Sequence, residues 1–209
     1  MQAVKEDIKE LFHQYSRATV VSIEKIPQSG SDRTYFRIKC QAAQSDQAFS
    51  YIATYSNNIK ENNTFINFSR HFKKNGCPVP EIYMVNEDQT IYIQEDFGDT
   101  SLLNELEEKG YIQEVYTLFQ KSLKALAHLQ VKGQKGLKYD WCITSREFGR
   151  QAIMSDLLYF KYYFLDTLKI PYDKEKLIDN FEALSTYLSH VDHKYFMFRD
   201  FQSRNVMIK

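Results

Sequence analysis

Asp200 and Asn205 are the residues of this chain whose types and spacing best suit catalysis. They stand in the segment FRDFQSRN, where an Arg-Asp pair is followed by four residues and an asparagine. At this spacing a carboxylate can orient an attacking hydroxyl and accept its proton, while an amide oxygen binds a metal ion that bridges phosphates. Apolar residues at 196–198 and 206–208 predict strands that hold the loop. The alternative is an ordinary loop with a capping aspartate and a turn asparagine.

The second segment whose residues could take part in chemistry is a turn rich in small residues. It lies in SGSDRTYFR, from Ser29 to Arg37, where Gly30 and Ser31 separate two expected strands. Backbone N–H groups of such a turn can bind phosphate oxygens. The segment lacks the GKS or GKT ending of a P-loop. A plain hairpin turn is the alternative.

The hydrophobic periodicity predicts the elements that would position these segments. The expected helices are at 3–17, 61–75, 101–107, 111–131, 146–168 and 174–190. The expected strands are at about 21–26, 35–40, 48–56, 81–86 and 90–96, with further strands on both sides of the loop near Asp200. We therefore predict an α+β fold with two lobes, a strand-rich lobe at 1–99 and a mainly helical lobe at 100–209. Ligand sites commonly lie in the cleft between two such lobes.

Taken together, these segments resemble the aminoglycoside-phosphotransferase and choline-kinase superfamily. The segment FRDFQSRNVMI resembles its catalytic loop, and most closely that of bacterial amino-sugar kinases, such as N-acetylmuramate/N-acetylglucosamine kinases, which carry H-R-D-x-x-x-R-N. This chain has Phe198 where the family usually has histidine. The turn resembles the family's G-S-x-R-x-Y-x-R turn. The resemblance covers about residues 20–209 and implies a protein-kinase-like fold, with an antiparallel N-terminal sheet and a helical C-terminal lobe.

The resemblance also implies roles for the loop residues. It makes Asp200 the catalytic base and Asn205 a ligand of Mg²⁺, and it lets Arg204 face phosphate or substrate. For Arg204 the alternative is a solvated or structurally paired arginine. The superfamily has a second acidic metal ligand after this loop, whereas this chain ends at Lys209. The sequence therefore predicts an incomplete C-terminal lobe and a truncated enzyme.

The segment QEDFGDTSL resembles the connection between the lobes in this family. The resemblance implies that the backbone near Glu95, Asp96 and Phe97 binds the adenine edge and that Asp99 reaches the ribose. The alternative for Asp99 is a cap on the helix at 101–107.

For the ATP phosphates, the resemblance implies contacts from Gly30, Ser31 and Arg33. Kinases of this type usually carry a lysine on the third strand, but YIATY at 51–55 has none. Lys60 is a candidate substitute, and a solvated surface lysine is the alternative.

Asp156, Tyr159 and Tyr163 share one face of the expected helix at 146–168. A carboxylate beside aromatic rings suits a sugar, through hydroxyl hydrogen bonds and stacking. An aromatic core face is the alternative.

The composition of the chain argues against several classes of partner and of structural site. Lys+Arg and Asp+Glu number 27 each, so the formal net charge of zero gives no general attraction to nucleic acid or to an anionic membrane. Three cysteines without a CxxC pair argue against a disulfide framework or a zinc site. The chain has no secretory signal and no apolar run long enough to cross a bilayer, which predicts a cytoplasmic protein.

We therefore expect a phosphotransferase that uses ATP and Mg²⁺ to phosphorylate a hydroxyl of a small polar molecule, a sugar or amino sugar. The alternatives are an aminoglycoside- or choline-type kinase and a non-catalytic nucleotide-binding module. The oligomeric state is left open.

Overall fold

The computed structural model of the chain describes residues 1–27, 32–42, 48–192 and 194–209. A five-stranded antiparallel sheet with helices forms the N-terminal part, and the part after it is mainly helical, so the predicted α+β class is confirmed. The chain divides into two compact units. We call 1–141 with 198–209 the sheet unit and 142–197 the helical-pair unit. The division into lobes at 99 and 100 stays a prediction.

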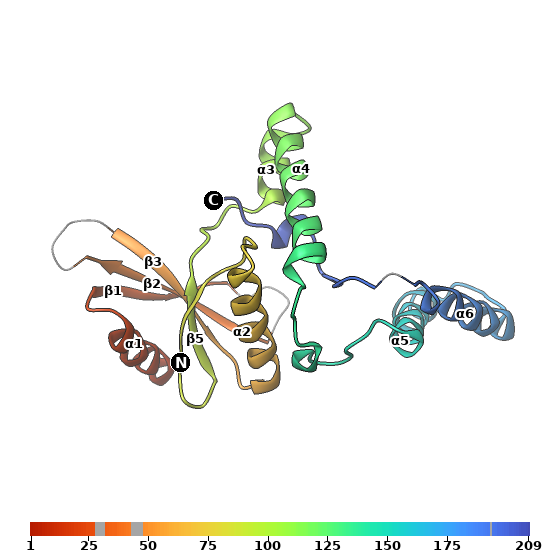
Figure 1. Cartoon of the computed structure of the whole chain (residues 1–209), viewed down its shortest axis with the longest axis horizontal. Coiled ribbons are helices and arrows are strands. Elements are labelled where there is room, and N and C mark those ends of the chain that lie inside the picture. The colour runs from red at the N-terminus through yellow and green to blue at the C-terminus, as the bar shows by residue number, and fades with distance from the viewer. Residues whose placement is uncertain (28–31, 43–47, 193) are drawn as a thin grey trace. The chain divides into compact units, whose positions relative to one another are not determined.

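The sheet has the strand order β1-β2-β3-β5-β4, with every pair antiparallel (Figure 1). Its strands are β1 (Thr19–Lys25), β2 (Thr34–Gln41), β3 (Ala48–Tyr55), β4 (Ile82–Val85) and β5 (Ile91–Glu95). All five lie where the sequence predicts strands. β5 lies between β3 and β4, so it runs beside β3, the central strand of the sheet. β5 is also the strand that leads into the predicted connection between the lobes.

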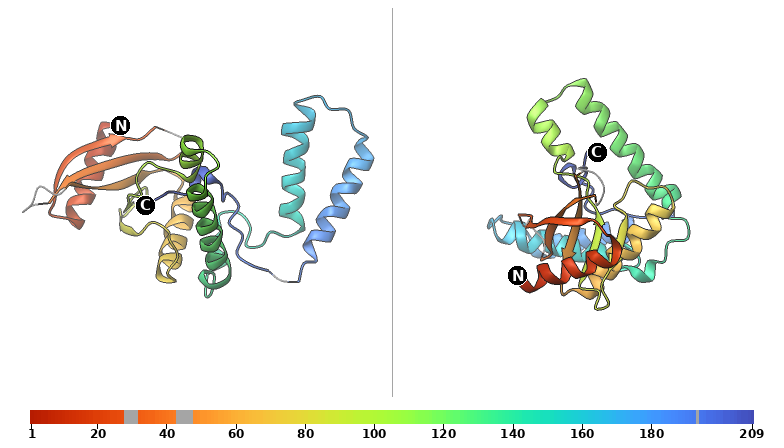
Figure 2. Two further views of the ribbon diagram at one scale, coloured as in Figure 1. Left: turned by 90° about the horizontal axis from the view of Figure 1, so that it is seen from above. Right: turned by 90° about the vertical axis from the view of Figure 1, so that its left-hand side faces the viewer.

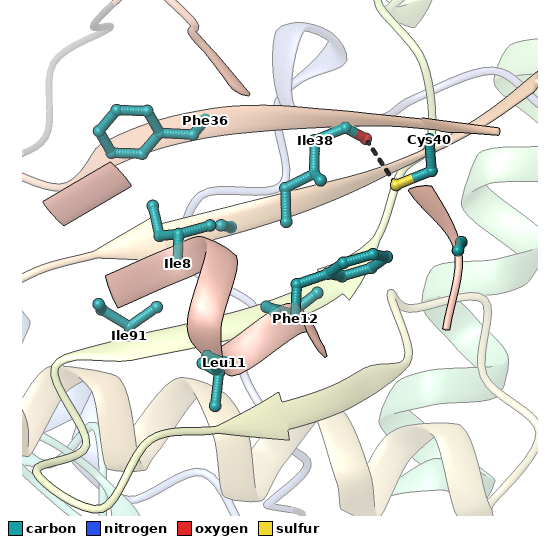
Figure 3. Close-up of a cluster of buried hydrophobic side chains, with 10 residues drawn as sticks. Ile8, Leu11, Phe12, Phe36, Ile38, Cys40 and Ile91 are labelled. Carbon is teal, nitrogen blue, oxygen red and sulfur yellow. Dashed lines mark hydrogen bonds between the residues drawn. The ribbon is translucent and has the colours of Figure 1, made fainter. Parts of the chain in front are cut away.

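Helix α1 (Gln2–Tyr15) covers one face of the sheet. Ile8 and Phe12 are fully buried there against Phe36 and Ile38 of β2 and Ile93 of β5 (Figure 3). Burying an aliphatic or phenyl side chain contributes about 1.5–3 kcal/mol, so this cluster is a main source of stability. The three- and four-residue spacing of the apolar residues in α1 places them all on this side.

Helix α2 (Ile59–Lys74) packs on the opposite face. Side chains alternate along a strand, so Tyr92 points away from the face that its neighbour Ile93 shares with α1. Tyr92 is fully buried against Phe65 and Ile66 of α2. Its aromatic ring stacks on that of Phe65, with centroids 5.3 Å apart.

Two further helices follow β5 in the sheet unit and run side by side, α3 (Leu102–Lys109) and α4 (Gln113–His128) (Figure 2). A π-helical turn, Leu129–Gly133, continues α4. His71 Nε2 of α2 bonds the carbonyl oxygen of Gly133 at 2.8 Å. A Cβ at Gly133 would lie 2.5 Å from Cys77 Sγ, so only glycine allows this close approach.

The helical-pair unit contains α5 (Arg150–Phe160), which continues as the π-helical segment Lys161–Asp166, and α6 (Lys174–Ser189). Both helices were predicted. Asp173 caps α6 by accepting hydrogen bonds from the N–H groups of Glu175 and Lys176. An ion pair between Arg150 and Glu182 joins α5 to α6.

The strand predicted before the loop near Asp200 is wrong, since residues 194–198 form none. After the loop, a single antiparallel bridge between Ser101 and Met207 stands where a strand was predicted. Apolar composition gives strand propensity, but a strand also needs a partner for its backbone hydrogen bonds. Among the described helices, none is both long and apolar enough to cross a membrane.

Candidate functional site

Two hydrogen bonds to the backbone carbonyl of Asp200 hold the loop that carries Asp200 and Asn205. Asn205 Nδ2 donates to the carbonyl oxygen of Asp200 at 3.0 Å, and the N–H of Gln202 donates to the same oxygen at 2.9 Å. A 3₁₀ turn at Ser203–Asn205 completes the loop. Within the described part of the chain, the Asp200 carboxylate accepts no hydrogen bond, and its side chain is exposed. The Asp200 carboxylate and the Asn205 amide oxygen are therefore left to bind a ligand.

Backbone pairing anchors this loop to the segment that leads into α3. The N–H of Leu102 donates to the carbonyl oxygen of Val206 at 2.8 Å, and the N–H of Ile208 donates to that of Thr100 at 2.9 Å. Ser101 and Asn104 form a capping box at the start of α3. These bonds fix the loop beside the predicted connection, residues 95–99.

A groove of about 420 Å³ in the sheet unit has both loop residues in its wall. Phe97 of the connection lines the same groove, so three of the predicted site residues are brought together. The rest of the wall is mainly apolar and comes from 78–80, from α4 and from 206–208. A mostly apolar groove with a few polar groups is typical of a small-molecule site.

Arg37 binds both aspartates of the connection, an arrangement that we call the Arg37 clamp. Its Nε donates to Asp96 Oδ2 at 2.7 Å, and its Nη1 donates to Asp99 Oδ2 at 2.7 Å. Ser50 Oγ and the N–H of Gly98 also donate to Asp96, at 2.7 and 2.8 Å. Gly98 has φ 82°, a left-handed conformation that glycine adopts without strain.

The clamp favours the ionised form of both carboxylates. Burial alone would raise the pKa of Asp96, but hydrogen bonds from Arg37, Ser50 and Gly98 lower it below the ordinary value. The hydrogen bond from Arg37 likewise lowers the pKa of Asp99. The carboxylates of Asp96 and Asp99 are thus engaged within the protein. The capping role considered for Asp99 belongs instead to Ser101.

Glu95 lies between two lysines at the start of the connection. Lys73 Nζ donates to its carboxylate at 2.8 Å, and Lys209 Nζ donates to the other oxygen. Burial would raise the pKa of Glu95, but the two lysines lower it to about 2. Lys209 Nζ also lies 5.3 Å from the ring centroid of Phe97. The side chain of Glu95 is therefore structural, and the contact to adenine implied for the backbone near Glu95, Asp96 and Phe97 stays a prediction.

The residues predicted to bind phosphate fall into three groups. Gly30 and Ser31 lie outside the described residues. Arg33 is only 12% exposed, and its Nη2 pairs with Glu61 Oε1 of α2 at 3.0 Å. Lys60 is exposed, at the start of α2. The sequence predicted no role for Glu61. Its position shortly after the third strand could have indicated one.

The predicted substrate residues lie in different units. Tyr159 and Tyr163 stack in the helical-pair unit with ring centroids 4.2 Å apart, and both are more than half exposed, so the predicted shared face is confirmed for these two. Asp156 lies on the same helix, whereas Arg204 lies exposed in the loop of the sheet unit. Their roles toward a substrate stay predictions.

The loop residues fit the requirements of Mg²⁺. This ion prefers oxygen ligands and is commonly held by one or two protein side chains together with phosphates and water. Asn205 offers an amide oxygen, and Asp200, which lines the same groove, carries a carboxylate. Among the described residues, no group of three or more His, Cys, Asp or Glu side chains could hold a metal by itself.

No model of a known protein family matches the chain. No curated protein sequence matches it either. A functional assignment therefore depends on the chemistry of the residues and on their arrangement.

Proposed function

We propose that this protein is an ATP- and Mg²⁺-dependent phosphotransferase with a protein-kinase-like two-lobe fold, and that it phosphorylates a hydroxyl of a sugar or amino sugar. The observation that carries the proposal is the loop in which Asn205 Nδ2 bonds the Asp200 carbonyl at 3.0 Å while both side chains line one groove with Phe97. Residue types, spacing and placement all agree with phosphoryl transfer.

Asp200 would orient the acceptor hydroxyl and take its proton as the oxygen attacks the γ-phosphorus and the bond to the ADP oxygen breaks. The amide oxygen of Asn205 would hold Mg²⁺, which when bound would neutralise charge on the phosphates. The internal bond from Asn205 Nδ2 orients the amide, so that its oxygen is the group that is presented. Positioning and charge neutralisation supply most of the catalysis in reactions of this kind.

The acceptor is assigned from the sequence resemblance to amino-sugar kinases. Tyr159, Tyr163 and Asp156 lie in the helical-pair unit, whereas the candidate loop lies in the sheet unit, so the assignment of the acceptor depends on the resemblance alone.

Calorimetric titration with ATP, with and without Mg²⁺, tests the nucleotide site. We expect Mg²⁺ to strengthen ATP binding in the wild type and to have little effect on binding in Asn205→Ala. Asp88→Asn, an exposed aspartate in the β4–β5 turn, is the control and should behave as the wild type. A wild-type chain that binds no ATP would overturn the proposal.

Phosphoryl transfer is then measured against a panel of sugars, amino sugars, aminoglycosides and choline. Asp200→Asn should keep ATP binding and lose roughly 10²–10⁴-fold in kcat, the usual range for a catalytic proton acceptor. Unchanged turnover in this variant would remove the base assignment. ATP binding without transfer to any acceptor would instead support a non-catalytic nucleotide-binding module.

A further inference from the structure

The position on β3 from which a kinase-type site takes its phosphate-binding cation is held here by an uncharged residue. In such sites a lysine of the third strand binds the phosphates and pairs with a glutamate of the neighbouring helix. Thr54 of β3 faces α2, because it pairs in register with Tyr92, which stacks on Phe65 of α2. Thr54 is fully buried and carries no charge.

Arg33 brings a cation to the same face of the sheet. It precedes β2 directly, and the next side chain of β2 on its face, Tyr35, pairs in register with Thr54. The guanidinium of Arg33 lies 5.1 Å from the ring centroid of Phe65 and pairs with Glu61. The cation and the glutamate thus join sheet to helix as a lysine–glutamate pair does, but the cation comes from the residue directly before β2.

Glu61 is itself held in place. It lies in the first turn of α2, and its N–H donates to the Asn58 side chain at 3.2 Å. Asn58 Nδ2 donates in turn to Glu61 Oε2 at 3.3 Å. Because both partners of the pair are oriented before any ligand arrives, little freedom remains to be lost on binding.

Lys60 differs from Arg33 in these respects. It is exposed, and no ion pair of Lys60 occurs in the described part of the chain. Arg33 also follows directly after the small-residue turn for which the sequence predicts phosphate contacts, and a planar guanidinium can donate two parallel hydrogen bonds to phosphate.

We propose that Arg33, positioned by Glu61, binds the phosphates of the nucleotide in place of the strand lysine. This inference rests on the proposed function, since it assigns the phosphate contact of the nucleotide that the proposed reaction uses.

The test compares the affinities for ATP and adenosine by calorimetry in the presence of Mg²⁺. Adenosine lacks the phosphates, so the ratio of the two affinities measures the phosphate contact alone. We expect Arg33→Gln to reduce ATP affinity roughly tenfold or more, with adenosine affinity unchanged, and Glu61→Gln to reduce it less. Arg17→Gln removes the same charge from an exposed arginine before β1 and should leave the ratio unchanged.

The variant Arg33→Lys separates a loss of the phosphate contact from a loss of folding. It keeps the charge beside Glu61 but loses the two-pronged donor, so a few-fold loss of ATP affinity is expected in a chain whose circular dichroism and Tm match the wild type. An unchanged ratio in both Arg33 variants, while ATP still binds, would overturn this inference alone. The same loss in Lys60→Gln, with Arg33 variants unaffected, would transfer the role to Lys60. A wild-type chain that binds neither ligand would overturn the proposed function as well.

Discussion

Arg37 stabilises the connection by satisfying two carboxylates at once. Asp96 and Asp99 would repel each other without it, and Asp96 is 5% exposed, so an unpaired charge there would be costly. With Arg37 between them, the residues from 96 to 99 are fixed against β2 and β3. The connection therefore has a single, well-determined backbone, which is what recognition of a flat base by backbone groups requires.

The two partners of Arg37 should differ in what they contribute to stability. Asp96→Asn removes the charge from a buried oxygen that accepts several hydrogen bonds, so we expect the free energy of unfolding to fall by about 2 kcal/mol. The Asp99 side chain is 76% exposed, and Asp99→Asn should cost less than about 1 kcal/mol because water screens the pair. Urea unfolding followed by circular dichroism measures both. If both variants lose the same free energy of unfolding, burial does not determine how much each aspartate contributes to stability.

Glu95 should make stability depend on pH in acid. Its pKa is about 2 in the folded chain and about 4.3 when unfolded. A lowered folded pKa contributes stability that is present above the unfolded value and is lost as the pH falls through the folded one. We expect Glu95→Gln to cost about 1 kcal/mol at pH 7, after allowance for solvent screening. This difference from the wild type should shrink between pH 5 and pH 2.

Urea unfolding at pH 7, 5, 3.5 and 2.5 measures this difference. Glu87→Gln, in the exposed turn between β4 and β5, is the control and should show no such trend. A Glu95→Gln deficit that persists at pH 2.5 would mean that lost packing, rather than lost charge, explains it.

Among the elements, α2 links the sheet to the site. Its apolar side packs on Tyr92, its first turn presents Glu61 to Arg33, and its last turn contacts the π-helical turn after α4 through His71. A change at the start of this helix should therefore affect both stability and ligand binding.

The cap of α2 provides the corresponding test. Asn58→Ala removes the acceptor of the Glu61 N–H, so the free energy of unfolding should fall by about 1 kcal/mol. Asn58→Ser should recover most of this, because serine is an equally good cap. Thermal unfolding measures the stability of both variants, and ATP titration their affinity. If alanine and serine behave alike, the side chain of Asn58 does not act as a cap.

The sequence predicted the elements better than the contacts between them. The strands of the sheet and the long helices were predicted because alternation and helical spacing are local signals, as in β2 and α1. The insertion of β5 between β3 and β4 and the pairing of Arg33 with Glu61 depend on residues far apart in the chain. Spacing predicted that Asp200 and Asn205 act together, but it could not show that Arg37 engages Asp96 and Asp99. The strand expected at 196–198 does not form, because residues 196–198 pair with no strand in the part of the chain that the structure describes.

For the whole molecule, the main feature is that residues 142–197, which stand in the sequence between the two segments of the sheet unit, form a compact unit of their own. The chain leaves the sheet unit after Trp141 and returns at Phe198, two residues before Asp200. The candidate loop thus belongs with the sheet, although residues 142–197 directly before it do not. Long-range assembly of this kind makes folding depend on late contacts rather than local ones.

Limited digestion with trypsin should distinguish the two units. Arg146 and Lys194 lie exposed in segments without regular structure, near the two junctions, whereas Lys39 lies within β2. Because a protease needs a locally extended chain, we expect the first cuts after Arg146 and Lys194, detected by mass spectrometry as fragments 1–146 and 147–194. Lys194 pairs with Glu147, but an exposed pair of this kind protects little. The variant Arg146→Gln with Lys194→Gln should lose both early fragments and keep the later ones. First cuts within the sheet, at Lys39 for example, would mean that the junctions are not where the chain opens most easily.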